Sequence, residues 1–298
     1  MDEICHFFRN FANQNCKIGS MKAKKILFIT QEIEPYVPES SYTLLGRQMS
    51  QHILERGREI RSFMPKWGNI NERRNQLHEV IRLSGMNLII DDTDHPLIIK
   101  VASIPAARMQ VYFIDNDDFF QKRLSVADKD GKEYTDNAER AIFYARGVLE
   151  TVKKLRWVPD VIHCQGWIAS IVPVLIKTAY KEEPSFRDCK VVFSVVDQPL
   201  THPLPETFAD AITYRECKPE VLDGLASPLQ AEDLQKLAIK YSDGVAISSA
   251  EPCQSIIDYA EQSGTPILPY AGEDWDKYLE FFDAIWSEGK TEEDEDED

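Results

Sequence analysis

Short apolar runs alternate along the chain with stretches in which apolar residues recur at helical spacing. The run Ile26–Ile29 predicts a buried strand, and apolar residues at positions 44, 45, 49, 53 and 54 then predict a helix. Gly57 is placed to end that helix, because glycine adopts the left-handed conformation of a helix C-terminus without steric cost. Residues 59–64 predict the next strand, which stops at Pro65. The main pattern therefore opens as a strand, helix, strand unit.

Residues 78–114 differ, because their apolar runs are short and are separated by Asp, Pro and Gly. Such spacing favours hairpins within or beside the main sheet. The alternation then resumes, with helices predicted at 136–156, 167–180, 230–241 and 250–261 and strands at 161–163, 191–195 and 244–248. Strands that alternate with helices indicate an α/β fold, with a Rossmann-like, mostly parallel sheet and helices on both faces. Ligands of such a sheet belong at the carboxyl ends of its strands.

The two ends of the chain depart from this pattern. Residues 1–21 lack helical or strand periodicity, so we predict a disordered N-terminal extension, with Met21 as the working start. The main domain is predicted over 22–270, followed by an amphipathic helix over 271–287 and a disordered acidic tail over 288–298. The helix has an aromatic stripe, for which core packing is favoured over a partner-docking face. The stripe consists of Trp275, Tyr278, Leu279, Phe282 and Trp286.

Acidic residues outnumber basic ones, with 50 Asp and Glu against 34 Lys and Arg and a net charge of −16. Residues 292–298 are all acidic and hold seven of these charges, which leaves −9 on the rest of the chain. A surface of this charge repels nucleic-acid backbones and anionic membranes, so neither is expected as a partner. No apolar run reaches the roughly 20 residues of a membrane-spanning helix, and the first 20 residues show no secretory signal. A cytoplasmic protein is expected.

The six cysteines form no C-x-x-C pair, so the sequence predicts reduced thiols rather than disulfides or a zinc site. The cluster Asp91-Asp92-x-Asp94-His95 and the pair His202-Pro203 are expected to be solvated rather than to bind a metal. The chain also has no G-x-G-x-x-G, Walker A, G-x-S-x-G or H-E-x-x-H motif. Neither a metal nor a cofactor is predicted.

Four groups of segments resemble one known family when they are taken in order. They are K-I-L-F-I-T-Q-E-I-E-P-Y (25–36) with L-E-R-G-R-E-I (54–60) and F-M-P-K-W-G (63–68), V-Y-F-I-D-N-D-D-F-F (111–120), Y-T-D-N-A-E-R-A-I-F-Y-A-R (134–146), and W-V-P-D-V-I-H-C-Q-G-W (157–167) with V-V-F-S-V (191–195). In this order, and more weakly through residues 237–249, they resemble the N-terminal catalytic half of starch and glycogen synthases, which are GT-B glycosyltransferases of family 5. Each motif alone is weak, but four in order over residues 22–250 favour this fold.

The resemblance implies a two-domain enzyme that binds ADP-glucose or UDP-glucose between two Rossmann-like domains. It implies transfer of glucose to the non-reducing end of an α-1,4-glucan, with retention and without a metal. Six residues match family motifs and are the candidates for a glucan or active-cleft contact. They are Tyr134, Asp136, Asn137 and Arg140 of Tyr-x-Asp-Asn-x-x-Arg, and His163 and Trp167 of His-x-His-Asp-Trp. A structural role stays open for Asp136 as a helix cap and for His163 as a buried histidine.

The largest departure from the family follows the first strand. The family has Lys-x-Gly-Gly-Leu-Gly-Asp there, whose glycines let the backbone approach a phosphate and whose lysine neutralises it. This chain instead has Pro38, Glu39, Ser40, Ser41, Tyr42, Thr43 and Leu44. Pro38 removes the cation, and Glu39 adds a negative charge that repels a phosphate at ~4 Å. This degenerate phosphate loop is expected to use Ser40 or Ser41 as a helix cap instead.

Two further departures concern the catalytic equipment. Gln165 and Gly166 stand where the family has the second His and the Asp of His-x-His-Asp-Trp. The chain also stops where the second domain, which binds most of the nucleotide-sugar in the family, is expected to begin.

These departures favour a glycogen or starch synthase-like pseudoenzyme that does not transfer glucose by itself. Such a protein is expected to bind α-glucan or to serve as an accessory subunit, and nucleotide-sugar binding is not favoured. The alternative is a glucosyltransferase completed by a partner chain that supplies the second domain. A third hypothesis is a structural interaction protein that uses the aromatic helix over 275–286 as its contact.

Overall fold

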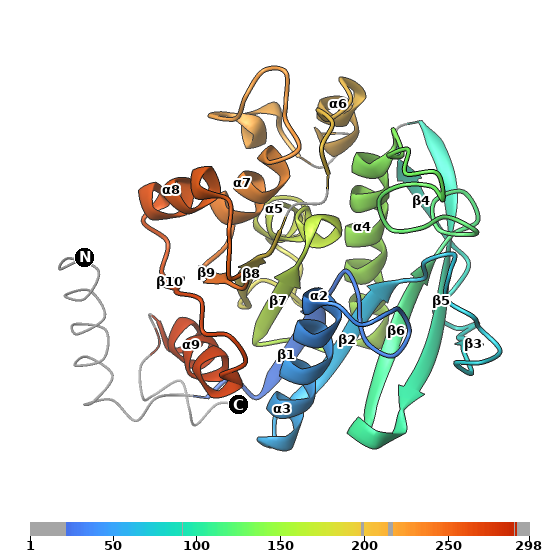
Figure 1. The fold of residues 1–298 in the computed structure, drawn as a ribbon, viewed down its shortest axis with the longest axis horizontal. Helices are drawn as coiled ribbons and strands as arrows, with labels where there is room; N and C mark the ends of the chain where they lie inside the picture. Colours follow the sequence, from blue (N-terminus) through green and yellow to red (C-terminus); the bar gives the residue numbers. More distant parts are fainter. Residues whose placement is uncertain (1–21, 91, 198–199, 214–216, 289, 291–298) are drawn as a thin grey trace.

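The structure, a computed structural model, describes residues 22–90, 92–197, 200–213, 217–288 and 290 (Figure 1). Within these residues ten strands form one mixed sheet. In the order in which they lie side by side, the strands are β10 (Ile267–Leu268), β9 (Gly244–Ile247), β8 (Lys190–Val195), β7 (Val161–Gln165), β1 (Lys25–Ile29), β2 (Glu59–Pro65), β6 (Met109–Asp115), β5 (Thr93–Ile104) and β3 (His78–Glu79), while β4 (Met86–Ile90) also pairs with β5.

The sheet is parallel from β10 to β6 and antiparallel beyond it. β1 pairs in parallel with both β2 and β7, and the pairs β2–β6, β7–β8, β8–β9 and β9–β10 are parallel as well. β5 pairs antiparallel with β3, β4 and β6, which confirms the hairpins predicted within residues 78–114. The predicted α/β fold with a mostly parallel sheet is confirmed.

Helices cover both faces of this sheet (Figure 1). They are α2 (Ser41–Leu44), which continues through the π-helical η1 (Leu45–Met49) into α3 (Ser50–Glu55), then α4 (Asn137–Leu155), α5 (Val172–Lys177), α6 (Thr207–Thr213), α7 (Asp233–Lys240), α8 (Gln254–Ser263) and α9 (Trp275–Ser287), with short 3₁₀ turns η2 (Pro105–Ala107), η3 (Trp167–Ala169) and η4 (Pro219–Leu222). α3, α4, α7 and α8 overlap the predicted helical positions, whereas α6 was not predicted and α9 begins at Trp275 rather than at residue 271. Gly57 has the positive φ (84°) expected of a helix end.

The alternation of side chains along β1 divides the core into two layers. Successive strand residues point to opposite faces of a sheet. Leu27 and Ile29 accordingly pack with residues of α4, α5, α7 and α8, whereas Ile26 and Phe28 pack with η1, α3 and α9. β1 is therefore buried from both sides, as its continuous apolar run predicted.

The C-terminal helix α9 is part of the second layer. Tyr278 and Phe282 are fully buried, and Gly244 on β9 lies so close that an added Cβ would be 3.0 Å from atoms of Phe281 and Ile285. The Asp283 carboxylate accepts from the Ala23 backbone N–H (2.9 Å) and from Arg58 (2.6 Å). The aromatic stripe is therefore core packing in this structure, rather than a face left open for a partner.

One predicted helix is interrupted. The helix expected over 167–180 is a 3₁₀ turn over Trp167–Ala169 followed by α5 over Val172–Lys177. Pro173 lies in the first turn of α5, where its missing N–H is tolerated, whereas a proline farther inside one continuous helix would remove a hydrogen bond. Residues 1–21, 289 and 291–298 of the predicted extension and tail lie outside the described residues, and the boundary predicted at 270/271 stays a prediction.

Candidate functional site

The carboxyl ends of the parallel strands meet at one edge of the sheet, and the segments that follow them form the candidate site. β1 leads into the degenerate phosphate loop, β6 leads through a long loop to the start of α4, and β7 ends at Gln165. Open parallel sheets bind ligands at this edge. Most of the residues singled out from the sequence are therefore brought to the same side of the molecule.

Ser40 closes the start of the helix that follows β1. Its hydroxyl accepts from the Thr43 backbone N–H (3.3 Å), and the Thr43 hydroxyl accepts from the Ser40 N–H (2.8 Å). This reciprocal pair is a capping box, which satisfies helix N–H groups that would otherwise face an anion. The predicted cap is confirmed, with Ser40 rather than Ser41 as the residue that provides it.

Negative charge surrounds this loop. Pro38 and Glu39 are exposed, and burial raises the pKa of the Glu32 carboxyl just after β1. Burial and the charge of Asp197 also raise the pKa of Tyr42 well above its ordinary value. Arg47, on η1, pairs with Glu34 (3.3 Å between Nη1 and Oε2). The positive charge of Arg47, just after this loop, is thus neutralised by Glu34.

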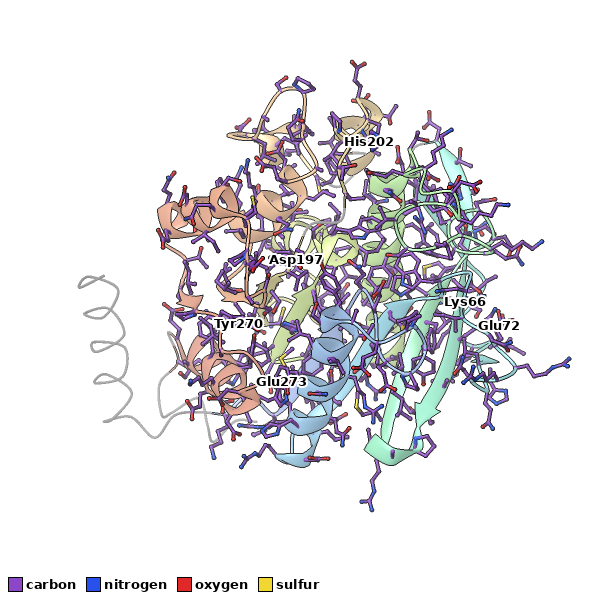
Figure 2. All side chains as sticks on the ribbon, in the orientation of Figure 1. Lys66, Glu72, Asp197, His202, Tyr270 and Glu273 are labelled. Atoms are coloured by element: carbon purple, nitrogen blue, oxygen red, sulfur yellow. The ribbon has the colours of Figure 1, made fainter. Side chains whose placement is uncertain are left out.

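Lys66, which follows β2 at the same edge, is neutralised in a similar way. It is 6% exposed, and its Nζ lies 3.0 Å from Glu72 Oε1 (Figure 2). Lys100 contacts the same Glu72 oxygen at 2.7 Å and Asp115 at 2.8 Å. The two lysines therefore belong to a balanced group of charges that ties residues 66–72 to β5 and β6.

Gln165 and Gly166, which replace two catalytic-motif residues of the family, fix the loops on either side of them. Gln165 Nε2 donates to the Tyr42 backbone carbonyl (2.9 Å). Gly166 has φ +82°, and an added Cβ would lie 2.6 Å from Gln31 Oε1. Gly46 is equally restricted, since its added Cβ would be 2.5 Å from the Glu32 carbonyl oxygen. The ends of β1 and β7 are thus packed tightly against the first turns after Ser40.

His163 lies away from this edge, within the core. It is 0% exposed, and its Nε2 lies 2.6 Å from the Ser194 hydroxyl. Phe28, its neighbour in the parallel register, and Phe282 of α9 pack against its ring with centroids 5.5 and 5.4 Å away. Burial lowers the pKa of His163 to about 3. No surface of the ring is left for a sugar, so we place His163 in the core and leave it out of the candidate site.

Replacing His163 by Gln is expected to flatten the pH dependence of stability between pH 7 and pH 5. An unfolded histidine titrates near ~6.5, whereas the buried one stays neutral until about pH 3. As pH falls below ~6.5 the unfolded chain binds a proton that the folded chain does not, so the free energy of unfolding of the wild type falls, by about 1–2 kcal/mol at pH 5. Urea unfolding of both proteins at the two pH values measures this; equal losses would contradict the neutral, buried assignment.

The other motif residues gather at the start of α4. Arg140 is fully buried and donates to the backbone carbonyls of Phe119 (2.9 Å), Leu124 (2.8 Å) and Ser125 (2.7 Å) and to Asn137 Oδ1 (2.7 Å). Burial lowers the pKa of its guanidinium to about 9, which leaves it a cation at neutral pH. Arg140 and Asn137 therefore hold the loop that precedes α4.

Tyr134 and Asp136, next to the buried Arg140 and Asn137, remain partly exposed. Asp136 begins α4, but its side chain makes no cap hydrogen bond and instead forms a two-pronged ion pair with Arg123, with 2.7 Å between Nη1 and Oδ2. Of the roles left open for Asp136, the structure shows an ion pair with Arg123 in place of a side-chain cap, because the guanidinium is the stronger partner for the carboxylate. Burial favours the neutral carboxyl, yet the hydrogen bonds and charge of Arg123 outweigh it and hold the pKa of Asp136 below its ordinary value.

Neither a metal site nor a membrane-spanning helix is found among the described residues. No group of three or more His, Cys, Asp and Glu side chains among them is placed to hold a metal ion. None of the helices in the same ranges is long and apolar enough to span a membrane.

Comparison with known proteins decides the family. The model for the starch synthase catalytic domain matches residues 25–268 of the chain. The chain belongs to this family. The resemblance noted in its motifs is therefore confirmed, and the matched range contains every candidate residue described above.

Several members of the starch synthase catalytic domain family are glycogen synthases similar to this chain. The protein of Chlorobaculum parvum is 34% identical over 242 residues, which are 80% of this chain and 48% of the relative. That of Chlorobaculum tepidum is 34% identical over 240 residues, with the same coverage. That of Chlorobium limicola is 37% identical over 172 residues, 57% of this chain and 35% of the relative. The chain thus spans about half the length, or less, of the curated relatives it matches.

A solved member of the family has the same fold. The catalytic domain of starch synthase IV from Arabidopsis thaliana, bound to ADP and acarbose, superposes with a TM-score of 0.62 over 84% of this chain and 52% of that chain. The sequence identity is 15%, so this likeness concerns the fold alone.

Sequence reasoning missed two residues of the candidate site, Arg123 and Trp67. Arg123 stacks on Tyr134 (4.3 Å from the guanidinium carbon to the ring centroid) in addition to pairing with Asp136. Trp67 donates to the Gln31 carbonyl (2.9 Å) and stacks near Trp167 with centroids 6.5 Å apart. Trp67 lies in segment 63–68, which resembles the family, so the sequence offered a reason to consider it. Arg123 lies between two such segments, and no motif pointed to it.

Proposed function

We propose that the protein is a cytoplasmic glycogen or starch synthase-like accessory protein that binds α-glucan and does not transfer glucose by itself. The observation that carries this proposal is the loop after β1. Its helix start is closed by the Ser40–Thr43 capping box, its arginine is paired with Glu34, and Pro38 stands where the family has a lysine. These features support a loop without the donors and the cation that a diphosphate needs.

Electrostatics at the same place disfavours a nucleotide-sugar further. The exposed carboxylates of Glu39 and Asp197 lie around the loop. Two like charges ~4 Å apart repel each other by about 1 kcal/mol even in water, and by more near a protein surface. A neutral polyhydroxyl ligand meets no such penalty, because carboxylates accept hydrogen bonds from hydroxyl groups.

Tyr134 and Asp136 are the residues proposed to meet the glucan. The ion pair with Arg123 fixes the orientation of the Asp136 carboxylate. The Arg140 guanidinium packs on the Tyr134 ring, with 5.0 Å between its carbon and the ring centroid. A fixed carboxylate beside a partly exposed aromatic ring offers an acceptor and an apolar face to a sugar. Asn137, Arg140 and Trp167, which are buried, support these two residues rather than contact the ligand.

Calorimetric titration of the purified chain with maltoheptaose, ADP-glucose and UDP-glucose tests the proposal. We expect weak maltoheptaose binding, with a Kd on the order of 1 mM or about −4 kcal/mol, and no nucleotide-sugar binding. A radiolabel assay is expected to show no transfer of glucose to glycogen. Asp136→Asn is expected to weaken maltoheptaose binding severalfold, whereas Asp188→Asn, at an exposed residue paired with Arg187, is the matched control.

Two results would overturn this function. Binding of ADP-glucose or UDP-glucose would contradict the account of the loop and favour a glucosyltransferase completed by a second chain. Glucosyl transfer by the purified chain alone would show that it is an active enzyme.

A further inference from the structure

The segment that leads from β8 to α6 is attached to the rest of the protein in two different ways. Its downstream part is held by burial, because Leu204 and Phe208 are both buried and the Leu204 N–H donates to the Leu229 carbonyl oxygen (3.0 Å). Residues 201–203, which we call the strap, are exposed and belong to no helix or strand. Polar contacts rather than apolar packing therefore hold the strap in place.

A single carboxylate oxygen makes these contacts. Glu133 Oε2 accepts from the Thr201 backbone N–H (3.0 Å) and from the Thr201 hydroxyl (2.9 Å), and it lies 2.8 Å from His202 Nδ1. Burial raises the pKa of Glu133, but the hydrogen bonds from His202 and Thr201 outweigh burial and hold it below the ordinary value. Glu133 is therefore an anion at neutral pH, and its three hydrogen bonds are charge-assisted. The imidazole can donate from Nδ1 both as a neutral ring and as a cation.

Glu133 is itself fixed by the loop that precedes α4. Ala127 and Glu133 form an antiparallel bridge, and the Tyr134 N–H donates to the Val126 carbonyl oxygen (3.1 Å). The Glu133 side chain is 12% exposed, so its carboxylate has little freedom to follow a moving partner. The contact therefore joins a fixed acceptor, directly before Tyr134, to donors on an exposed segment.

A second contact farther along the same segment has a different support. The Thr207 hydroxyl at the start of α6 donates to Glu139 Oε1 in the first turn of α4 (3.1 Å), and α6 packs on α4. Figure 2 shows His202 beside α6, on the side of the molecule where α4 lies. Since α6 is part of the core, the contact at Thr207 is secured by packing, whereas the contact at Thr201 is not. The contact with Glu133 is the one that can break while the core stays folded.

We propose that the strap opens locally from the folded protein and that the Glu133 carboxylate is the latch that keeps it closed. Segments held by exposed hydrogen bonds open at a lower free energy than segments held by apolar burial. Because all the donors converge on one oxygen, they are released together. Opening separates the segment after β8 from the loop that contains Tyr134 and leaves a carboxylate without its donors beside that residue. The inference involves no ligand, so it stands or fails independently of the proposed function.

Hydrogen exchange resolved to single amides tests the latch in the wild type and in Glu133→Gln. Glutamine keeps the size of the side chain and one acceptor oxygen but loses the charge, so we expect the Thr201 amide to exchange about 5- to 10-fold faster. The Leu204 amide and the amides of residues 142–152 in α4 are expected to keep their wild-type rates. His202→Ala removes one of the donors at an exposed position (71%) and is expected to accelerate the Thr201 amide about 2- to 3-fold.

Glu206→Gln is the matched control, because it makes the same change at an exposed residue of the same segment. Among the described residues the Glu206 side chain has no hydrogen-bond or ion-pair partner, so the Thr201 amide is expected to exchange at the wild-type rate in this variant.

Three results would overturn the latch. The first is an unchanged Thr201 amide in both Glu133→Gln and His202→Ala. The second is equal acceleration of the Thr201 amide and the α4 amides in Glu133→Gln, which would mean that Glu133 stabilises the whole domain. The third is a Thr201 amide that exchanges as slowly as the α4 amides in the wild type, which would mean that the strap opens only when the core unfolds.

Discussion

Replacing Arg140 by Met is expected to lower the free energy of unfolding by about 3–5 kcal/mol. The guanidinium satisfies three backbone carbonyls and the Asn137 side chain, all within the buried loop that precedes α4. Methionine fills a similar volume but donates no hydrogen bond, so these acceptors lose their partner, and each costs about 1–3 kcal/mol when it stays unpaired. Part of this cost is recovered where the loop moves and the carbonyls reach water, which limits the total.

Urea unfolding followed by circular dichroism measures the effect. Arg187→Met is the matched control, because Arg187 is exposed and pairs with its neighbour Asp188, so its loss is expected to change stability by less than about 0.5 kcal/mol. Arg140→Lys is expected to fall between the two, since a lysine keeps the charge but not the planar fork of donors. A loss below about 1 kcal/mol for Arg140→Met would contradict a structural role and would return Arg140 to the list of residues that contact a ligand.

Replacing Phe282 by Ala is expected to destabilise the domain by about 3–5 kcal/mol. Phe282 is fully buried, packs on His163 and belongs to the layer formed by β1, α3 and α9. Its removal leaves a cavity in addition to the lost burial of the ring. The size of this effect separates a core helix from a docking helix, because a helix that served mainly as a partner contact would tolerate the change.

Glu280→Ala on the exposed side of α9 is the control for this variant and is expected to leave stability within about 0.5 kcal/mol of the wild type. Chemical unfolding of the three proteins at one pH gives the comparison. Near-wild-type stability of Phe282→Ala would revive the hypothesis of an interaction protein, in which the aromatic face of residues 275–286 binds a partner.

Much of the fold could be predicted because buried positions are apolar and recur with the period of the strand or helix that contains them. The continuous apolar run of β1 reflects a strand covered on both faces, and the spacing from Leu45 to Ile53 reflects a helix with one covered face. The break within residues 167–180 was missed because the apolar period continues through it, although Pro173 in the first turn of α5 indicates where a new helix begins. The π-helical turn at Leu45–Met49 was missed for the same reason, since its apolar spacing hardly differs from that of an α-helix.

The candidate site was less predictable because its contacts join residues that are distant in the sequence. A cap at Ser40 or Ser41 could be predicted because capping depends on residues three positions apart, and the structure selects Ser40. The partner of Asp136 could not be predicted, because Arg123 lies 13 positions earlier in a loop without a motif. The register of β1 with β7 decides that the His163 ring points toward α9, and register does not follow from a motif match.

The packing of α9 on β1 has a consequence for how the protein is made. β1 is the first described strand and α9 the last described helix, yet they share one hydrophobic layer, and Asp283 of α9 binds the backbone at Ala23. A ribosome synthesises the two segments more than 200 residues apart. Until residues 275–287 emerge, the face of β1 that contains Ile26 and Phe28 lacks part of its cover, so apolar surface of the nascent chain stays exposed during synthesis. Synthesis of residues 275–287, rather than of β1, then sets the earliest moment at which this layer can close.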